Sequence, residues 1–221
     1  MFMGHYSAAF AAKRAAPGLP LPVYFLACQF IDLLWGSLVL LDVEKLRVIP
    51  HFTATNGLDL YFMPYTHGLP AALAWSAAAS GLFWSCTSPA FPQRTRTAAV
   101  LALTVLSHWL LDLVVHIPDL PLWSDGVKVG LGLWNHPLAA LLLELVLVWT
   151  GMALLAVQTG ARRKRYLLLA FVMSVLQLSS LVLEPPQPHQ VASHLLVTYL
   201  ALTAAAYWVS RPRIAAVPQP A

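Results

Sequence analysis

The chain has 221 residues, of which 59% are hydrophobic and only 10% are charged, with 13 Lys and Arg against 9 Asp and Glu. Soluble proteins carry about 25% charged residues, so a soluble globular domain is excluded, and the high hydrophobicity excludes a disordered chain. Two cysteines, Cys28 and Cys86, are too few for a disulfide framework or a cysteine-based zinc site. The composition therefore predicts a polytopic membrane protein.

In chain order, the first apolar stretch is Met1–Ala12, which is too short to cross a bilayer and ends at Lys13-Arg14. We expect it to form a short helix that lies at the membrane or dips into it. Six later stretches have the roughly 20 apolar residues that a spanning helix needs. They are Pro22–Leu41, Tyr65–Cys86, Thr97–Ile117, His136–Val157, Tyr166–Leu183 and Val191–Ser210.

These stretches predict an all-α membrane helix bundle, with six transmembrane helices plus a half-inserted N-terminal helix. The bundle forms one domain over residues 1–210, and the Pro-rich segment 211–221 is expected to be a disordered tail. The positive charges predict the orientation, because cytoplasmic loops carry an excess of Lys and Arg. Six crossings leave Lys45, Arg47 and Lys128 on one side and all other Lys and Arg on the opposite side. Both termini are therefore expected on the cytoplasmic side of the plasma (inner) membrane.

The basic clusters between apolar runs are typical of membrane orientation and do not indicate a nucleic-acid partner. The sequence also has no Gly-rich phosphate loop, so no nucleotide site is expected. Function is better sought in the ionisable residues of the spans, since each costs about 2.5–3.5 kcal/mol to insert.

The third span carries three such residues, His108, Asp112 and His116, at intervals of four. Successive fours advance about 400° around a helix, so these side chains project from one face along roughly 12 Å of axis. Asp32 lies halfway along the first span, and His67 opens the second span from the outer side. These residues fall at mid-membrane or in its outer half.

A set of imidazoles and carboxylates at one depth suits a divalent metal, most simply Zn²⁺, with Mn²⁺ or Fe²⁺ as alternatives. Such an ion with an open coordination position supplies hydroxide from bound water. His5 reaches the same cluster only if the N-terminal helix dips inward from the cytoplasmic side. His116, Asp59 and Glu144, the last about two turns inside the fourth span, are the candidates for proton transfer.

The ordered set of motifs Gly4-His5, Asp32, Tyr65-Thr66-His67-Gly68 and Ser107-His108 with Asp112 resembles the membrane-bound metal-dependent hydrolase family (the YdjM-like group). That family is distantly similar to zinc-dependent phospholipase C. The resemblance covers roughly residues 1–123 and implies metal ligation by five residues: His5, Asp32, His67, His108 and Asp112. Gly68 stands where the family has Ser, and His116 is a candidate ligand that the family pattern does not supply.

Three functions follow from these patterns. The first is a metal-dependent hydrolase that acts on a membrane lipid or lipid-linked ester or phosphoester near the outer leaflet. The second is a transporter of metal, protons or a small solute, because proton relays use carboxylate–histidine chains. The third is a non-catalytic membrane scaffold, in which the polar residues hold helices together.

Overall fold

The computed structural model describes residues 1–156, 163–181 and 187–211. Within these ranges the chain is mostly helical, as expected, and contains eight α-helices. They are α1 (Tyr6–Ala15), α2 (Leu21–Cys28), α3 (Phe30–Leu40), α4 (Leu69–Cys86), α5 (Arg94–Val115), α6 (Pro137–Ala156), α7 (Arg163–Ser179) and α8 (Pro188–Ser210).

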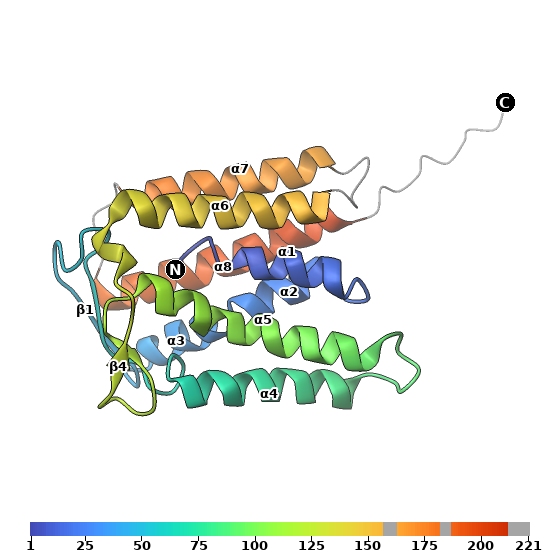
Figure 1. The fold of residues 1–221 in the computed structure, drawn as a ribbon, viewed down its shortest axis with the longest axis horizontal. Coiled ribbons are helices and arrows are strands. Elements are labelled where there is room, and N and C mark those ends of the chain that lie inside the picture. The colour runs from blue at the N-terminus through green and yellow to red at the C-terminus, as the bar shows by residue number, and fades with distance from the viewer. Residues whose placement is uncertain (157–162, 182–186, 212–221) are drawn as a thin grey trace.

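Two short antiparallel hairpins, which the sequence did not predict, interrupt the helices. The first pairs β1 (Lys45–Val48) with β2 (Leu58–Phe62), and the second pairs β3 (Leu120–Pro121) with β4 (Lys128–Val129). A short 3₁₀ helix, η1 (Leu133–Asn135), precedes α6. The helices run along the long axis of the molecule, and both hairpins lie at one end of it (Figure 1). We call this end the hairpin end.

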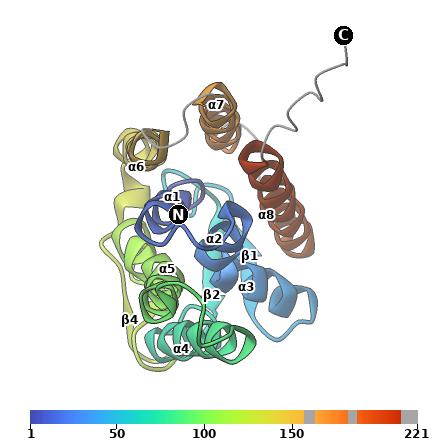
Figure 2. The ribbon, with the colours of Figure 1, turned by 90° about the vertical axis from the view of Figure 1, so that its right-hand side faces the viewer.

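Helix α1 lies inside the bundle and not on its surface. Figure 2 shows it beside α2, α5 and α6. Its Tyr6 and Phe10 are fully buried, and the preceding residues Met1, Met3 and His5 are buried as well. Met1 therefore lies in the bundle interior.

The crossing of α1 and α6 depends on a glycine. A Cβ added at Gly151 of α6 would stand 2.9 Å from Ser7 Cα, closer than side-chain carbons approach backbone. Small residues let membrane helices pack this closely. The absence of a side chain at Gly151 thus brings α1 deep enough to deliver its N-terminal residues to the interior.

Helices α2 and α3 are two halves of one predicted span, bent by 54° at a break around Gln29. In an unbroken helix the carbonyl of Cys28 would accept the N–H of Asp32, four residues on. At the break this carbonyl accepts a hydrogen bond from the His108 ring on α5. The bend therefore creates a backbone acceptor in the middle of the bundle.

The prediction of six transmembrane helices is supported only in part. Among the described residues, three helices, α5, α6 and α8, are long and apolar enough to cross a membrane, and the bent pair α2–α3 adds a fourth if it counts as one span. Helix α4 begins at Leu69 rather than Tyr65, because residues Tyr65–Gly68 form a turn and Pro70 stands in the first helical turn. The ends of two predicted spans, at Val157 and Leu183, and the predicted tail from residue 212 lie outside the described residues.

Hydrogen bonds join the two hairpin segments to each other at the hairpin end of the bundle. Lys128 Nζ donates to the carbonyl of Tyr61 (2.5 Å), and Thr55 Oγ1 donates to the carbonyl of Trp134 (2.6 Å). Segment 42–64 thus forms a cap with segment 117–136. This cap covers the end of α5 that carries the polar residues.

Candidate metal centre

The five residues that the family resemblance implied as ligands come together in the interior. His5 directly precedes α1, Asp32 is in the first turn of α3, and His67 precedes α4. The remaining pair, His108 and Asp112, lies on α5. All five are buried. Two overlapping triplets have ligand atoms within 4.8 Å of one another, namely His5 with Asp32 and His108, and His67 with His108 and Asp112.

The carboxylates of Asp32 and Asp112 each lie close to the rings of His67 and His108. Asp32 Oδ1 lies 3.3 Å from His67 Nε2 and 3.4 Å from His108 Nε2. Asp112 Oδ2 lies 3.6 Å from His67 Nε2 and 3.2 Å from His108 Nε2. Zinc bonds of about 2.0–2.2 Å in a tetrahedron separate neighbouring ligand atoms by about 3.3–3.6 Å. Each of these four carboxylate–imidazole distances is close to the separation of two ligands of one ion, while Asp32 and Asp112 belong to different triplets.

His5 is the fifth member of the set. Its ring stacks on that of His108, with centroids 3.7 Å apart, and its Nε2 lies 3.1 Å from Asp112 Oδ1. The amine of Met1 lies 2.5 Å from the same oxygen. The N-terminal segment thus reaches the cluster, a question that the sequence left open.

Two polar side chains in the outer helices hold this N-terminal segment in place. Glu144 on α6 accepts the N–H of Phe2 at Oε1 (2.8 Å) and the N–H of Gly4 at Oε2 (2.6 Å). Gln177 on α7 accepts the N–H of Met3 (3.2 Å). Buried backbone N–H groups must be paired, and side chains of α6 and α7 pair these three.

Three of the histidines use Nδ1 for a hydrogen bond and turn Nε2 toward the cluster. The partner of His108 Nδ1 is the Cys28 carbonyl (2.8 Å), and the partner of His116 Nδ1 is Asp119 Oδ1 (2.8 Å). His67 Nδ1 contacts Thr66 Oγ1 (2.9 Å). Metal-binding histidines almost always have such a contact on the other ring nitrogen, since it sets the tautomer and the ring orientation.

Asp32 is oriented in the same way. The hydroxyl of Tyr199 on α8 donates to Asp32 Oδ2 (2.7 Å), which leaves Oδ1 as the oxygen that faces the two histidines. Figure 2 shows α8 beside α2 and α3. A residue on the last helix therefore determines which oxygen of Asp32 faces the histidines.

The cluster has the donor set of a metal site and not that of a closed hydrogen-bond network. Although Nε2 of His5 and of His108 lie within 3.1–3.4 Å of carboxylate oxygens, neither forms a hydrogen bond of good geometry within the described ranges. Buried polar atoms without partners are costly, and the two buried carboxylates call for positive charge. A divalent ion between them would answer both requirements, so the residues fit such an ion.

The three residues considered for proton transfer are placed differently. His116 faces the cluster, with Nε2 3.8 Å from Asp112 Oδ1, and its ring packs on Trp134. Both carboxylate oxygens of Glu144 bind backbone N–H groups. Asp59 lies on β2, where it pairs with Arg47 across the hairpin (2.9 Å).

Sequence reasoning did not single out the residues that orient the ligands, Tyr199, Glu44, Asp119 and the Thr66 hydroxyl. Glu44 lies between α3 and β1 and is 1% exposed. Burial raises the pKa of its carboxyl, while hydrogen bonds from Thr66 act in the opposite direction. Glu44 lies in a loop segment of the sequence, so only the tertiary structure shows that its carboxyl is buried.

Comparison with known proteins adds no relative. No protein-family model, curated protein or solved structure matches the chain.

Proposed function

We propose that the protein is an integral membrane hydrolase that uses a divalent metal, with zinc as the first candidate, to cleave a lipid or lipid-linked ester or phosphoester. The observation that carries this proposal is the convergence of five buried His and Asp side chains, which form two overlapping triplets at the spacing of metal ligands. The proposal agrees with the resemblance of the motifs to the YdjM-like family of membrane-bound metal-dependent hydrolases.

The chain's own residues have separate tasks in this proposal. Asp32, His67, His108 and Asp112 hold the ion, and His5 adds a fifth donor from α1. A divalent ion held there would act as a Lewis acid on the scissile group and would activate water for hydrolysis. His116 is the residue for proton transfer at Nε2, because Asp119 occupies its Nδ1. Glu144 and Asp59 are less suited, since their oxygens are engaged elsewhere.

The depth of the cluster supports a lipid substrate. Apolar side chains cover the outside of the helices that surround it, for example Leu103 and Leu110 on α5 and Leu138 and Leu142 on α6, which are all exposed. We propose that these faces contact acyl chains and that the basic end of the bundle faces the cytoplasm of the plasma membrane. Six crossings, with α4 and α7 as the two shorter ones, complete this arrangement.

Metal content tests the proposal first. The wild-type protein, purified in detergent and analysed by mass spectrometry, is expected to retain about one equivalent of zinc or another divalent metal, and a His108→Ala variant is expected to lose it. The metal-loaded protein is then incubated with a membrane lipid extract and the products are identified. Stoichiometric metal without any cleaved lipid, together with metal-coupled uptake into sealed vesicles, would replace the hydrolase with a transporter. Absence of metal in a folded wild type would leave a scaffold.

A further inference from the structure

Three histidines of the cluster, His67, His108 and His116, have a hydrogen-bond partner at Nδ1. For His67 this partner does not by itself determine the tautomer of the ring. The partners of His108 and His116 are a carbonyl and a carboxylate, which can only accept, so Nδ1 of both rings carries the proton. The partner of His67 is the hydroxyl of Thr66, which can donate or accept. What decides the direction of this hydrogen bond also decides whether His67 Nε2 has a free lone pair.

Glu44 lies on the other side of the Thr66 hydroxyl. Its Oε2 is 2.5 Å from Thr66 Oγ1, and its Oε1 accepts the backbone N–H groups of Tyr65 and Thr66 (2.8 and 2.9 Å). A distance of 2.5 Å is typical of a hydroxyl that donates to a carboxylate. Thr66 has one hydroxyl proton, so a Thr66 that donates to Glu44 must accept from His67.

We infer that Glu44 is a positioning residue of the metal centre, which acts through Thr66 to hold His67 as the Nδ1–H tautomer and to leave Nε2 free for the ion. The inference rests on the proposed metal centre. Trp109, whose Nε1 donates to the His67 carbonyl (2.9 Å), holds the backbone of the same residue. We call the hydrogen bonds that run from Glu44 through Thr66 to His67 the relay. Trp109 fixes the backbone of His67, and the relay fixes the position of the proton on its ring.

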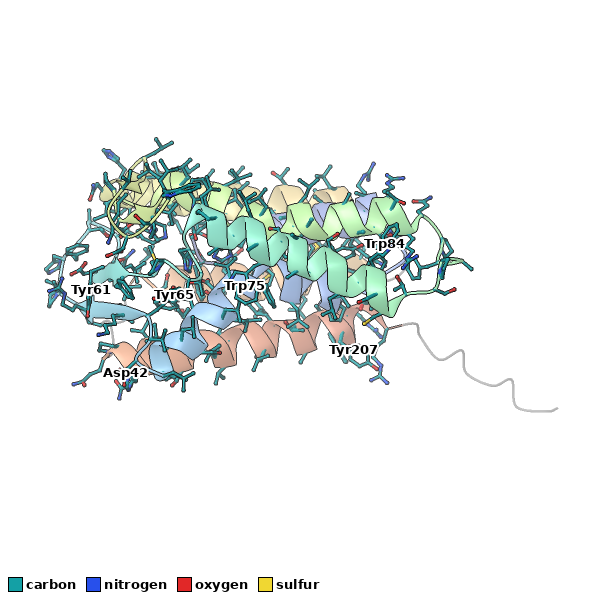
Figure 3. The ribbon with its side chains drawn as sticks, turned by 90° about the horizontal axis from the view of Figure 1, so that it is seen from below. Asp42, Tyr61, Tyr65, Trp75, Trp84 and Tyr207 are labelled. Carbon is teal, nitrogen blue, oxygen red and sulfur yellow. The ribbon has the colours of Figure 1, made fainter. Side chains whose placement is uncertain are left out.

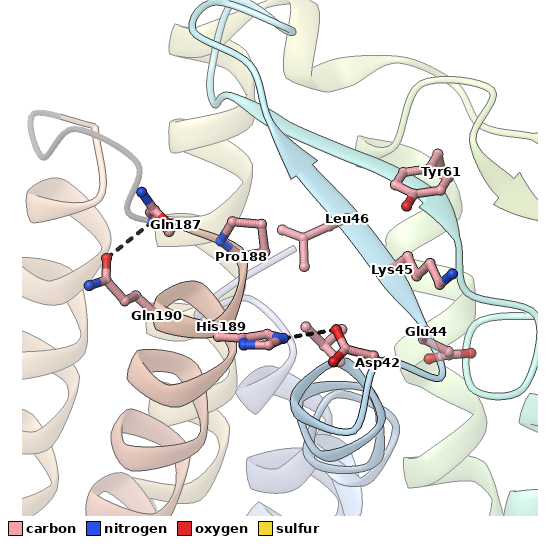
Figure 4. Close-up of a pocket in the computed structure, with 10 residues that line it drawn as sticks. Asp42, Glu44, Lys45, Leu46, Tyr61, Gln187, Pro188, His189 and Gln190 are labelled. Atoms are coloured by element: carbon pink, nitrogen blue, oxygen red, sulfur yellow. Dashed lines mark hydrogen bonds and ion pairs between the residues drawn. The ribbon is translucent and has the colours of Figure 1, made fainter.

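Glu44 also lines a cavity of about 620 Å³ at the hairpin end, together with Asp42, Lys45, Tyr61 and His189. Figure 4 shows Glu44 at the start of β1, between this cavity and the loop that leads into α4. Its neighbour Asp42 lines the same cavity but bonds to His189 on α8 (3.0 Å), away from Thr66. Asp42 therefore provides a matched control that has the same charge and the same cavity but no contact with the relay.

The experiment compares Glu44→Gln with Asp42→Asn. A glutamine amide donates to Thr66 Oγ1, which then donates to His67 Nδ1 and moves the ring proton to Nε2. We expect Glu44→Gln to weaken zinc affinity by about 10–100-fold, the usual cost of losing an outer contact of a metal-binding histidine. Asp42→Asn is expected to leave the affinity unchanged. Thr66→Val should weaken zinc binding as Glu44→Gln does, whereas Thr66→Ser, which keeps the hydroxyl, should bind zinc as the wild type does.

Nitrogen-15 NMR of the histidine rings supplies a readout that does not need metal. In the metal-free wild type, the His67 signals are expected to be those of the Nδ1–H tautomer, and in Glu44→Gln those of the Nε2–H tautomer. An unchanged tautomer with wild-type zinc affinity in Glu44→Gln would overturn the inference. A wild type that binds no zinc would instead remove the proposed function, while the tautomer comparison would still report on the relay. If Glu44→Gln fails to fold, Thr66→Val tests the same hydrogen bond without changing a charge.

Discussion

The two ends of the bundle carry their charges in different ways. At the hairpin end, where Figure 3 labels Asp42, Tyr61 and Tyr65, acids and histidines project into the interior and contact one another. At the opposite end, where Trp84 and Tyr207 are labelled, the charges are basic and stack on aromatic rings at the surface. The pairs are Arg94 with Trp84, Arg165 with Trp208 and Arg211 with Tyr207.

The difference is one of solvation. A buried charge that loses its partner keeps the full cost of desolvation, whereas an exposed one is solvated again by water or lipid headgroups. The hairpin end therefore depends on particular distances between particular atoms. The opposite end depends on an excess of positive charge, since among the described residues its charged side chains are Lys and Arg from the ends of α1, α5, α7 and α8. Substitutions at the two ends should differ in size and in kind.

The largest effect is expected from Asp112→Asn, because this carboxylate contacts His5, His67 and His108. Breaking a buried ion pair costs about 3–5 kcal/mol, and the metal loses a ligand as well. Thermal unfolding in detergent and metal content are both expected to fall sharply. Asp125→Asn, at the more exposed pair with Lys128, is the control and should change stability by less than about 1 kcal/mol. Equal effects of the two substitutions would contradict the contrast.

Glu144→Gln should have the next largest effect. The amide group can accept only one of the two backbone N–H groups that Glu144 now accepts, and its NH₂ would face the other. Hydrogen bonds to charged groups are worth about 1.5–3 kcal/mol, so we expect a loss in that range and weaker metal binding through a displaced His5. Gln177→Met, which removes one bond to a neutral amide, should cost about 1 kcal/mol. The reverse order in unfolding experiments would remove the assigned role of Glu144.

Tyr199→Phe should separate metal affinity from stability. It removes the hydrogen bond to Asp32 Oδ2 and keeps the ring, so the helix packing is conserved. Zinc titration is expected to show a loss of about 10–100-fold in affinity, with a small change in unfolding temperature. Tyr207→Phe on the same helix, whose ring lies under Arg211, is the matched control and should bind zinc as the wild type does. Identical affinities of the two variants would show that Asp32 needs no such contact.

The smallest effect is expected at the basic end. Arg94→Met removes the stacking on Trp84, whose ring centre lies 4.1 Å from the guanidinium, and the hydrogen bonds of the guanidinium to the Trp84 carbonyl and Thr87 Oγ1. Exposed cation–π pairs are worth about 0.5–1 kcal/mol. Zinc affinity should stay at the wild-type value, because the nearest ligand on α5, His108, is almost four turns away. A loss of metal in Arg94→Met would mean that the two ends are coupled.

Much of the cluster's α5 side could be predicted from the sequence, because helical spacing alone makes His108 and Asp112 neighbours. The structure has their side chains 3.2 Å apart. The approximate positions of the helices also follow from apolar runs between breakers. The shorter helices depart from this pattern: α4 starts four residues later than predicted because a turn binds Glu44, and the first span divides at Gln29.

Composition and the periodicity of apolar residues by themselves indicated a mostly helical chain with helices apolar enough to cross a membrane, and which polar residues are costly to bury, since both follow from transfer free energies that act locally. Only the tertiary structure decided that α1 enters the interior, that Tyr199 binds one oxygen of Asp32 and leaves the other facing the histidines, and that Glu44 faces Thr66. These contacts join residues up to 167 positions apart in the chain. No local pattern encodes such contacts, because they depend on how helices cross and bend, as at Gly151 and Gln29.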